Sequence, residues 1–112
     1  MKKIEAIIRL AKFEEIRAEL ASIGIPFFTL QEVKGYGLQK GNSITYRGSS
    51  YDSDYIPRLQ LEIFTEDEKV EEVISTILHA GGTGEIGDGK IVVIDIEQIV
   101  RIRTGEVGAS AI

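Results

Sequence analysis

The sequence predicts an α+β fold of the order βαββαβ, in which one antiparallel sheet carries both helices on the same face. Apolar residues recur at helical spacing in two segments and alternate or cluster as strands in four others. Glycine and proline residues separate these segments. This order is the ferredoxin-like split βαβ arrangement, and 112 residues suffice for one domain, residues 1–112.

The first half of the chain predicts a strand, a helix and a second strand. Residues 4–10 form a strand rich in Ile and Ala, and residues 12–23 place four apolar side chains at helical spacing. Gly24 is a typical helix stop, and Pro26 cannot continue the helix. Residues 27–33 then resume strand character.

A long segment without apolar periodicity follows, from residue 35 to residue 55. It holds four glycines together with serines, tyrosines and mixed charges. Loops longer than about 12–15 residues inside a domain are usually functional or disordered. We therefore expect a long loop between the second and third strands, which a ligand or a partner orders.

The second half predicts a strand, a helix and a last strand. Residues 56–64 alternate cleanly, and Thr65 with Glu68 has the spacing of a helix capping box. Residues 70–78 carry one apolar helix face, and Gly81 and Gly82 end the helix. Residues 91–96 form an apolar strand, which residues 99–103 extend or supplement.

The predicted sheet has a second face that the two helices leave open. Residues 27–28 and 59–64 carry apolar side chains on both sides of their strands. Burial between identical chains is the natural way to cover such a face. The sequence therefore predicts a homo-oligomer.

Composition excludes several functional classes. The net charge of −5 argues against general nucleic-acid binding, which depends on neutralising phosphates. The absence of cysteine excludes disulfides, thiolate metal ligands and a thiol nucleophile, and it fits a cytoplasmic location. No apolar run approaches the roughly 20 residues that span a bilayer, so we expect no membrane insertion. The first residues alternate like a strand rather than a secretory leader.

The most informative segment is glycine-rich and ends in a cation. Gly84, Gly87 and Gly89 leave backbone N–H groups open to an anion, and Lys90 follows directly. Arg101 and Arg103 come a dozen residues later, spaced to share one strand face. A glycine-rich loop alone is weak evidence, but its pairing with these cations predicts a nucleotide phosphate site.

Two long motifs resemble the signatures of the PII signal-transduction family. The first is Tyr46-Arg47-Gly48-Ser49-Ser50-Tyr51, with a mismatch at Ser50. The second starts at Thr83 and continues as Gly87-Asp88-Gly89-Lys90-Ile91, with Val92 in place of an aromatic residue. The Arg-Thr-Gly sequence at residues 103–105 matches as well. The chain is therefore similar to this family along its whole length.

The resemblance implies a homotrimer with a nucleotide in each cleft between subunits. Three segments would meet there: a T-loop (residues 37–55), a B-loop (residues 82–90) and a C-terminal loop (residues 101–112) of the neighbouring subunit. Members of the family bind ATP or ADP, and many bind 2-oxoglutarate through a magnesium ion held on ATP. The T-loop then regulates a target protein, which is a transporter, an enzyme or a regulator.

The same resemblance implies roles for individual residues. It implies that the phosphates would be held by Gly87, Asp88, Gly89, Lys90, Arg101 and Arg103. It also implies that the adenine would be surrounded by Thr29, Glu62 and the Phe64 backbone. Gly35, Gly37 and Leu38 would also border the nucleotide, Gln39 would ligate magnesium only with ATP, and Arg58 would meet 2-oxoglutarate.

Two departures from the family pattern change the expected ligand. Leu38 stands where the family usually has a cation, and Glu85 stands where it usually has Lys. Both changes reduce positive charge near the outer phosphates, so ATP loses more affinity than ADP. We expect a protein that favours ADP and responds poorly to 2-oxoglutarate. The alternative is a full ATP, magnesium and 2-oxoglutarate sensor, which the retained Gln39 favours.

Other interpretations concern modification and catalysis. Tyr51 occupies the position that some members uridylylate, and another branch is phosphorylated at the position of Ser49, but a loop tyrosine can equally contact a partner. No Ser–His or Cys–His pair exists, and the lone His79 is assigned no role, so we expect no enzyme. Small ferredoxin-like phosphatases and trimeric interaction modules remain alternative classes, because fold does not fix function.

Overall fold

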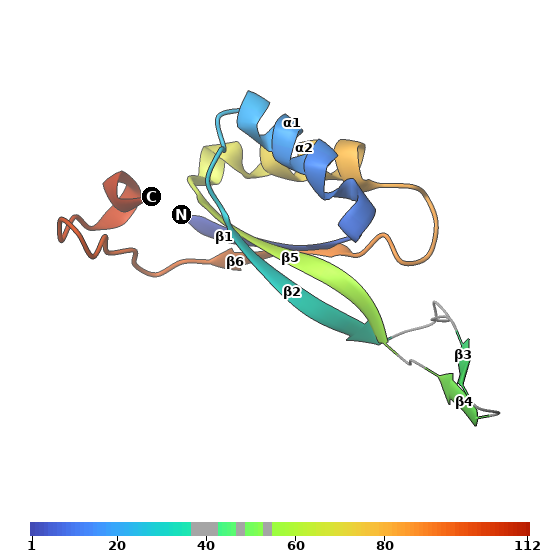
Figure 1. Cartoon of the computed structure of the whole chain (residues 1–112). Helices are drawn as coiled ribbons and strands as arrows, with labels where there is room; N and C mark the ends of the chain where they lie inside the picture. The colour runs from blue at the N-terminus through green and yellow to red at the C-terminus, as the bar shows by residue number, and fades with distance from the viewer. Residues whose placement is uncertain (37–42, 47–48, 53–54) are drawn as a thin grey trace.

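The computed structural model describes residues 1–36, 43–46, 49–52 and 55–112. Its main sheet has four antiparallel strands in the order β2-β5-β1-β6. Their bounds are β1 (Lys2–Ile8), β2 (Thr29–Tyr36), β5 (Tyr55–Thr65) and β6 (Lys90–Asp95). Helices α1 (Phe13–Ser22) and α2 (Val70–Gly81) both cover one face of this sheet (Figure 1). The predicted βαββαβ fold is confirmed.

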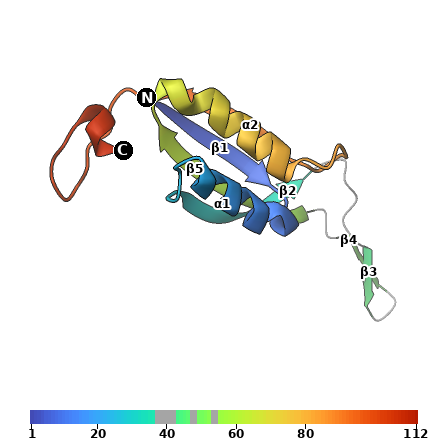
Figure 2. The same ribbon diagram turned by 90° about the horizontal axis from the view of Figure 1, so that it is seen from above.

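Strand β1 occupies the centre of the sheet, between β5 and β6. Its alternating pattern turns Ile4, Ala6 and Ile8 toward the helices, and all three are buried. Leu61 and Ile63 of β5 lie on the same face and are buried too. The side chains of both helices close the core from above: Ile16 and Leu20 of α1, and Val73 and Ile77 of α2. Figure 2 shows the two helices lying over the sheet, one on each side of β1.

Strands β2 and β5 extend beyond the helical layer as a two-stranded ribbon (Figure 1). The ribbon is paired up to Tyr36 and Tyr55, whose rings meet edge to face at 6.4 Å. The Lys34 ammonium lies 4.6 Å from the centre of the Tyr55 ring. The ribbon thus ends where the T-loop begins.

The prediction of an irregular loop from residue 35 to residue 55 is wrong in part. Strand β2 continues to Tyr36, and a separate hairpin pairs β3 (Ser43–Tyr46) with β4 (Ser49–Asp52). A hairpin satisfies its backbone hydrogen bonds locally and needs no apolar periodicity, so the sequence pattern did not reveal it.

The predicted capping box is also wrong. Thr65 is the last residue of β5 and is buried, and no side-chain cap begins the 3-10 helix η2 (Asp67–Lys69) that leads into α2. The Asp67 carboxylate instead accepts a hydrogen bond from the amino group of Met1 at 2.8 Å. This contact joins the first residue of the chain to the start of η2.

Residues 99–103 do not form a strand. Val100 and Val107 form an isolated bridge, and a turn at residues 102–104 separates them. The Gly105 N–H closes this turn on the Arg101 carbonyl at 2.7 Å, with Gly105 at a φ of 74°. Arg101 and Arg103 therefore do not share a strand face, contrary to the prediction. The 3-10 helix η3 (Gly108–Ala111) completes the C-terminal loop.

The sheet face opposite the helices carries both charged and apolar groups. Lys3 pairs there with Glu5 at 2.9 Å and with Glu62 at 3.1 Å. Phe64 is exposed, and Phe27, just before β2, is 87% exposed. Phe28, by contrast, packs edge to face on Phe13 of α1 at 6.1 Å. The homotrimer that such a face suggests stays a prediction. No helix in the described ranges is long and apolar enough to cross a bilayer.

The core assignment can be tested with a matched pair of leucines. Leu61→Ala removes a side chain that is 0% exposed, and we expect the free energy of unfolding to fall by about 2–5 kcal/mol because a cavity remains. Leu78→Ala on α2, where the side chain is 62% exposed, should change it by less than about 0.5 kcal/mol. Urea unfolding at one fixed protein concentration measures both. Equal losses would contradict this core.

Candidate functional site

The B-loop folds around the carboxylate of Asp88. The backbone N–H groups of Thr83 and Gly84 each donate to its Oδ2 at 2.8 Å, and the Thr83 hydroxyl donates to its Oδ1. Gly84, Gly87 and Gly89 have φ angles of 85°, 103° and 98°, which favour glycine. The loop is therefore a closed turn with a built-in anion at its centre.

An arginine outside the loop completes this arrangement. Arg9, directly after β1, donates from Nε to Asp88 Oδ1 at 2.8 Å and from Nη2 to the Ile86 carbonyl at 2.9 Å. The Thr83 hydroxyl, the Arg9 guanidinium and the Thr83 N–H together hold the pKa of Asp88 far below its usual range. The Asp88 side chain is thus occupied by hydrogen bonds within the loop and with Arg9.

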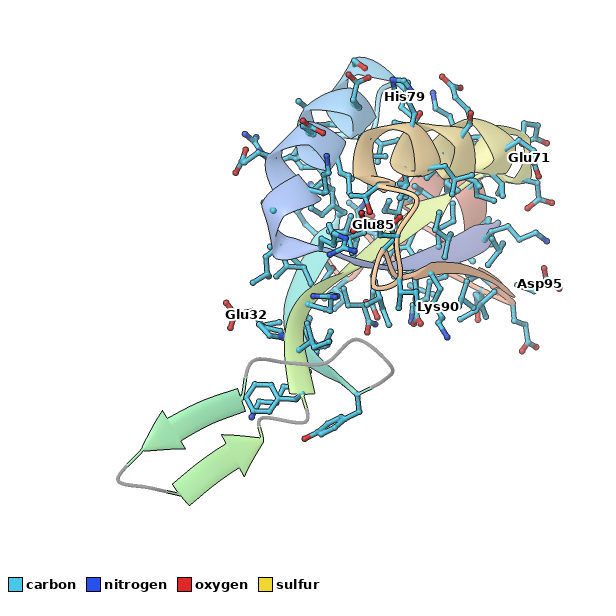
Figure 3. All side chains as sticks on the ribbon, turned by 90° about the vertical axis from the view of Figure 1, so that its right-hand side faces the viewer. Glu32, Glu71, His79, Glu85, Lys90 and Asp95 are labelled. Atoms are coloured by element: carbon cyan, nitrogen blue, oxygen red, sulfur yellow. The ribbon has the colours of Figure 1, made fainter. Side chains whose placement is uncertain are left out.

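Gly89 fixes the end of the B-loop against β1. A Cβ at this position would lie 1.7 Å from the Ile7 carbonyl oxygen, so no other residue fits without moving the backbone. Lys90 follows as the first residue of β6, and its side chain is exposed. Figure 3 shows Glu85 on the B-loop and Lys90 just below it, with Asp95 at the far end of the same strand.

A second group of predicted residues lines a cavity of about 540 Å³. Thr29 and Glu62 face each other across the β2–β5 pairing, and Phe64 lies two residues further along β5. Lys69 and Ile112 also line this cavity. The structure therefore brings the three residues predicted to hold adenine together beside one concave surface.

The two C-terminal arginines lie apart from the B-loop. Arg101 is half-buried and donates to Glu106 Oε1 at 3.1 Å and to the Ile112 carbonyl at 3.1 Å. Arg103 is exposed in the turn that follows. Lys90 begins β6, whereas the arginines lie beyond its other end, where the chain leaves the sheet (Figure 1). One chain alone does not unite the predicted cations.

The remaining predicted residues lie at or near the T-loop. Gly37, Leu38 and Gln39 are outside the described residues, and Ser49 and Tyr51 are described only as backbone of β4. Gly35 pairs with Ile56 inside the ribbon.

Within the described ranges, no three His, Cys, Asp or Glu side chains are grouped to hold a metal ion. His79 is exposed on the outer side of the helical layer (Figure 3).

Arg58 of β5 belongs to the same neighbourhood as the B-loop. Partial burial lowers its pKa, and the charge of Arg9 acts in the same direction. The Asp88 carboxylate opposes both effects. The guanidinium groups of Arg9 and Arg58 therefore both interact electrostatically with the Asp88 carboxylate.

Comparison with known proteins identifies the family. The family model "Nitrogen regulatory protein P-II" matches residues 1–106. This chain belongs to the P-II family. It is 49% identical to nitrogen regulatory protein P-II of Azospirillum brasilense and 47% identical to that of Pasteurella multocida, with both chains covered completely. Nitrogen regulatory protein P-II 1 of Escherichia coli K12 is 46% identical over the same extent. The chain is thus a PII signalling protein, which confirms the resemblance.

Sequence reasoning found the B-loop but missed Arg9 of this PII protein. Arg9 and Asp88 are 79 positions apart, and no local motif links them. The available signal was a cation at the end of a buried strand, which by itself has many ordinary explanations. Only the sheet pairing of β1 with β6 places it beside the glycine-rich segment.

The close approach at Gly89 predicts a ranking of two substitutions. Gly84→Ala and Gly89→Ala both place a Cβ on a residue with positive φ, which costs about 1–2 kcal/mol. Gly84 has open space around it, whereas Gly89 abuts Ile7, so we expect the larger loss of unfolding free energy for Gly89→Ala. Urea unfolding compares the two. A greater loss for Gly84→Ala would show that the B-loop does not pack on β1 in this way.

The lowered pKa of Asp88 predicts how stability depends on pH. In the unfolded chain this carboxyl titrates near 3.8, and in the folded protein it titrates lower. The stabilisation is therefore fully present above the unfolded pKa, and it is lost as pH falls through the folded pKa. We expect the unfolding free energy to decline below about pH 4, with a shallower decline for Asp88→Asn. Parallel curves for the two proteins below about pH 4 would refute this.

Proposed function

We propose that this PII protein binds an adenine nucleotide in clefts between the subunits of a homotrimer. The separation of two half-sites carries this proposal. The B-loop with Lys90 lies at one end of β6, and Arg101 with Arg103 lies beyond the other end. A second copy that brings its C-terminal loop to the B-loop would unite these cations, as the family resemblance implies.

The chemistry of the cavity and that of the B-loop each suit one part of a nucleotide. Cavities of roughly 300–1,000 Å³ are typical for small ligands, and the cavity at Thr29, Glu62 and Phe64 falls in that range. The Glu62 carboxylate can accept from an exocyclic amine, and the exposed Phe64 offers an apolar surface. The B-loop supplies glycine N–H groups and the Lys90 ammonium for phosphates.

The charges of the B-loop favour ADP over ATP. Glu85 is exposed on this loop, where it adds a negative charge beside the phosphate position. Repulsion by one charge grows with the number of phosphate charges, so it disfavours ATP more strongly. Magnesium would enter only with ATP, through Gln39, and 2-oxoglutarate would follow magnesium. A protein that holds ATP weakly would therefore respond little to 2-oxoglutarate.

Regulation would pass through the T-loop in the cytoplasm. The β2–β5 ribbon joins the T-loop to the sheet, and Gly35 lies in that ribbon beside Ile56. A nucleotide with different contacts in two T-loop conformations shifts their populations, and a target protein reads the result. The family resemblance favours a membrane transporter or a metabolic enzyme as that target, and no catalytic turnover is assigned to the chain itself. Tyr51 or Ser49 would be the place for a modifying group.

Calorimetric titration with ADP and with ATP tests the nucleotide proposal. Each nucleotide is titrated with and without magnesium and 2-oxoglutarate, and we expect ADP to bind about tenfold more tightly than ATP. Failure of both nucleotides to bind would reject the proposed function. If ATP binds tightly and 2-oxoglutarate strengthens that binding, the ADP preference is wrong and the protein is a full ATP, magnesium and 2-oxoglutarate sensor.

A charge reversal isolates the contribution of Glu85. Glu85→Lys should tighten ATP more than ADP, because it adds attraction where the outer phosphates lie. Glu71→Lys makes the same charge change at an exposed position near the start of α2, away from the B-loop (Figure 3). It should leave the ratio of the two affinities unchanged. An equal response to both substitutions would mean that net charge, and not the position of Glu85, sets the preference.

A further inference from the structure

We propose that Arg9 is the positioning residue that gives the B-loop its anion-binding shape, acting through Asp88. The inference rests on the proposed nucleotide function and assigns a residue that sets the affinity of that site. Arg9 need not touch the ligand. Its guanidinium holds the loop that does.

Two separate contacts give Arg9 this role. Its Nε binds the Asp88 carboxylate at 2.8 Å, and its Nη2 binds the Ile86 carbonyl at 2.9 Å. One rigid guanidinium thus spans two points of the loop on either side of Gly87. The pair is largely shielded, with side chains 20% and 25% exposed, so solvent weakens it less than a fully exposed ion pair.

The loop is anchored to one strand at adjacent points. The Gly89 backbone lies against the Ile7 carbonyl, and Arg9 is only two residues further along the chain. The Asp88 carboxylate also fixes the first part of the loop, because the Thr83 and Gly84 N–H groups both donate hydrogen bonds to it. Loss of Arg9 would remove the link between this carboxylate and the end of β1, so the loop would keep only its internal hydrogen bonds and its packing at Gly89.

Arg9 also compensates a charge that would otherwise oppose the ligand. An ionised Asp88 without a cationic partner would repel phosphate from the middle of a phosphate site. Arg58 is near enough to influence both groups, but its guanidinium is partly buried in β5. Arg9 therefore has two effects, on loop shape and on charge, and a lysine at this position can restore only the charge and one hydrogen bond.

A double-mutant cycle with two readouts tests this role. Arg9→Ala, Arg9→Lys, Asp88→Asn and the double variant Arg9→Ala with Asp88→Asn are compared in the full chain. Calorimetry gives the affinity for ADP, and NMR hydrogen exchange without nucleotide gives the protection of the Thr83 and Gly84 amides. Arg17→Ala is the matched control, because Arg17 also pairs with a carboxylate, that of Glu14 at 2.8 Å, on exposed α1.

We expect Arg9→Ala to weaken ADP binding about tenfold and to speed exchange of both amides by a similar factor. Arg9→Lys should recover part of each loss. In the Asp88→Asn background, Arg9→Ala should cost clearly less ADP affinity than in the unmodified protein, because the ion pair is already gone and only the contact with the Ile86 carbonyl is lost. Arg17→Ala should alter neither readout.

Two results would overturn the proposal. Additive losses from Arg9→Ala and Asp88→Asn would show that Arg9 does not act through Asp88. Unchanged exchange at Thr83 and Gly84 in Arg9→Ala would show that it does not shape the loop. If the unmodified protein binds neither ADP nor ATP, the nucleotide function fails, and the exchange data alone still decide whether Arg9 positions the B-loop.

Discussion

The central constraint in this structure is the burial of β1 between β5 and β6. Its inward side chains form the middle of the core, so its register with both neighbours cannot slip without exposing them. The same strand also positions the functional loop, because the Ile7 backbone meets Gly89 and Arg9 follows at the strand end. Stability and the geometry of the site therefore depend on one rigid element, as a preorganised binding site requires.

Most of the fold was predictable because local patterns and global packing agree. The α1 helix, Phe13–Ser22, lies inside the predicted range of 12–23, since apolar side chains at a period of 3.6 need one face to bury. The alternation of apolar and polar residues over 56–64 likewise predicted β5. The failures came where other forces decide. Thr65 is buried by the sheet and cannot cap a helix, and the turn after Arg101 depends on a glycine with positive φ.

The candidate site was predictable in its residue types but not in its geometry. The glycines and cations in the sequence predicted the B-loop. Few ligands other than phosphates need both a close approach of the backbone and a positive charge. Sequence could not show that the Asp88 carboxylate faces inward or that Arg9 meets it, since that contact depends on how sheet strands are paired. It also could not show that Arg101 is already held by Glu106 and the Ile112 carbonyl.

Both chain ends take part in the structure, which matters for the design of fusion proteins. The charged amine of Met1 binds Asp67, and a peptide joined to it would replace that amine by a neutral amide. At the other end, Ile112 borders the cavity at Thr29 and Glu62, and its carbonyl accepts from Arg101. An affinity tag at the C-terminus would start at the rim of that cavity, so a cleavable N-terminal tag disturbs binding measurements less.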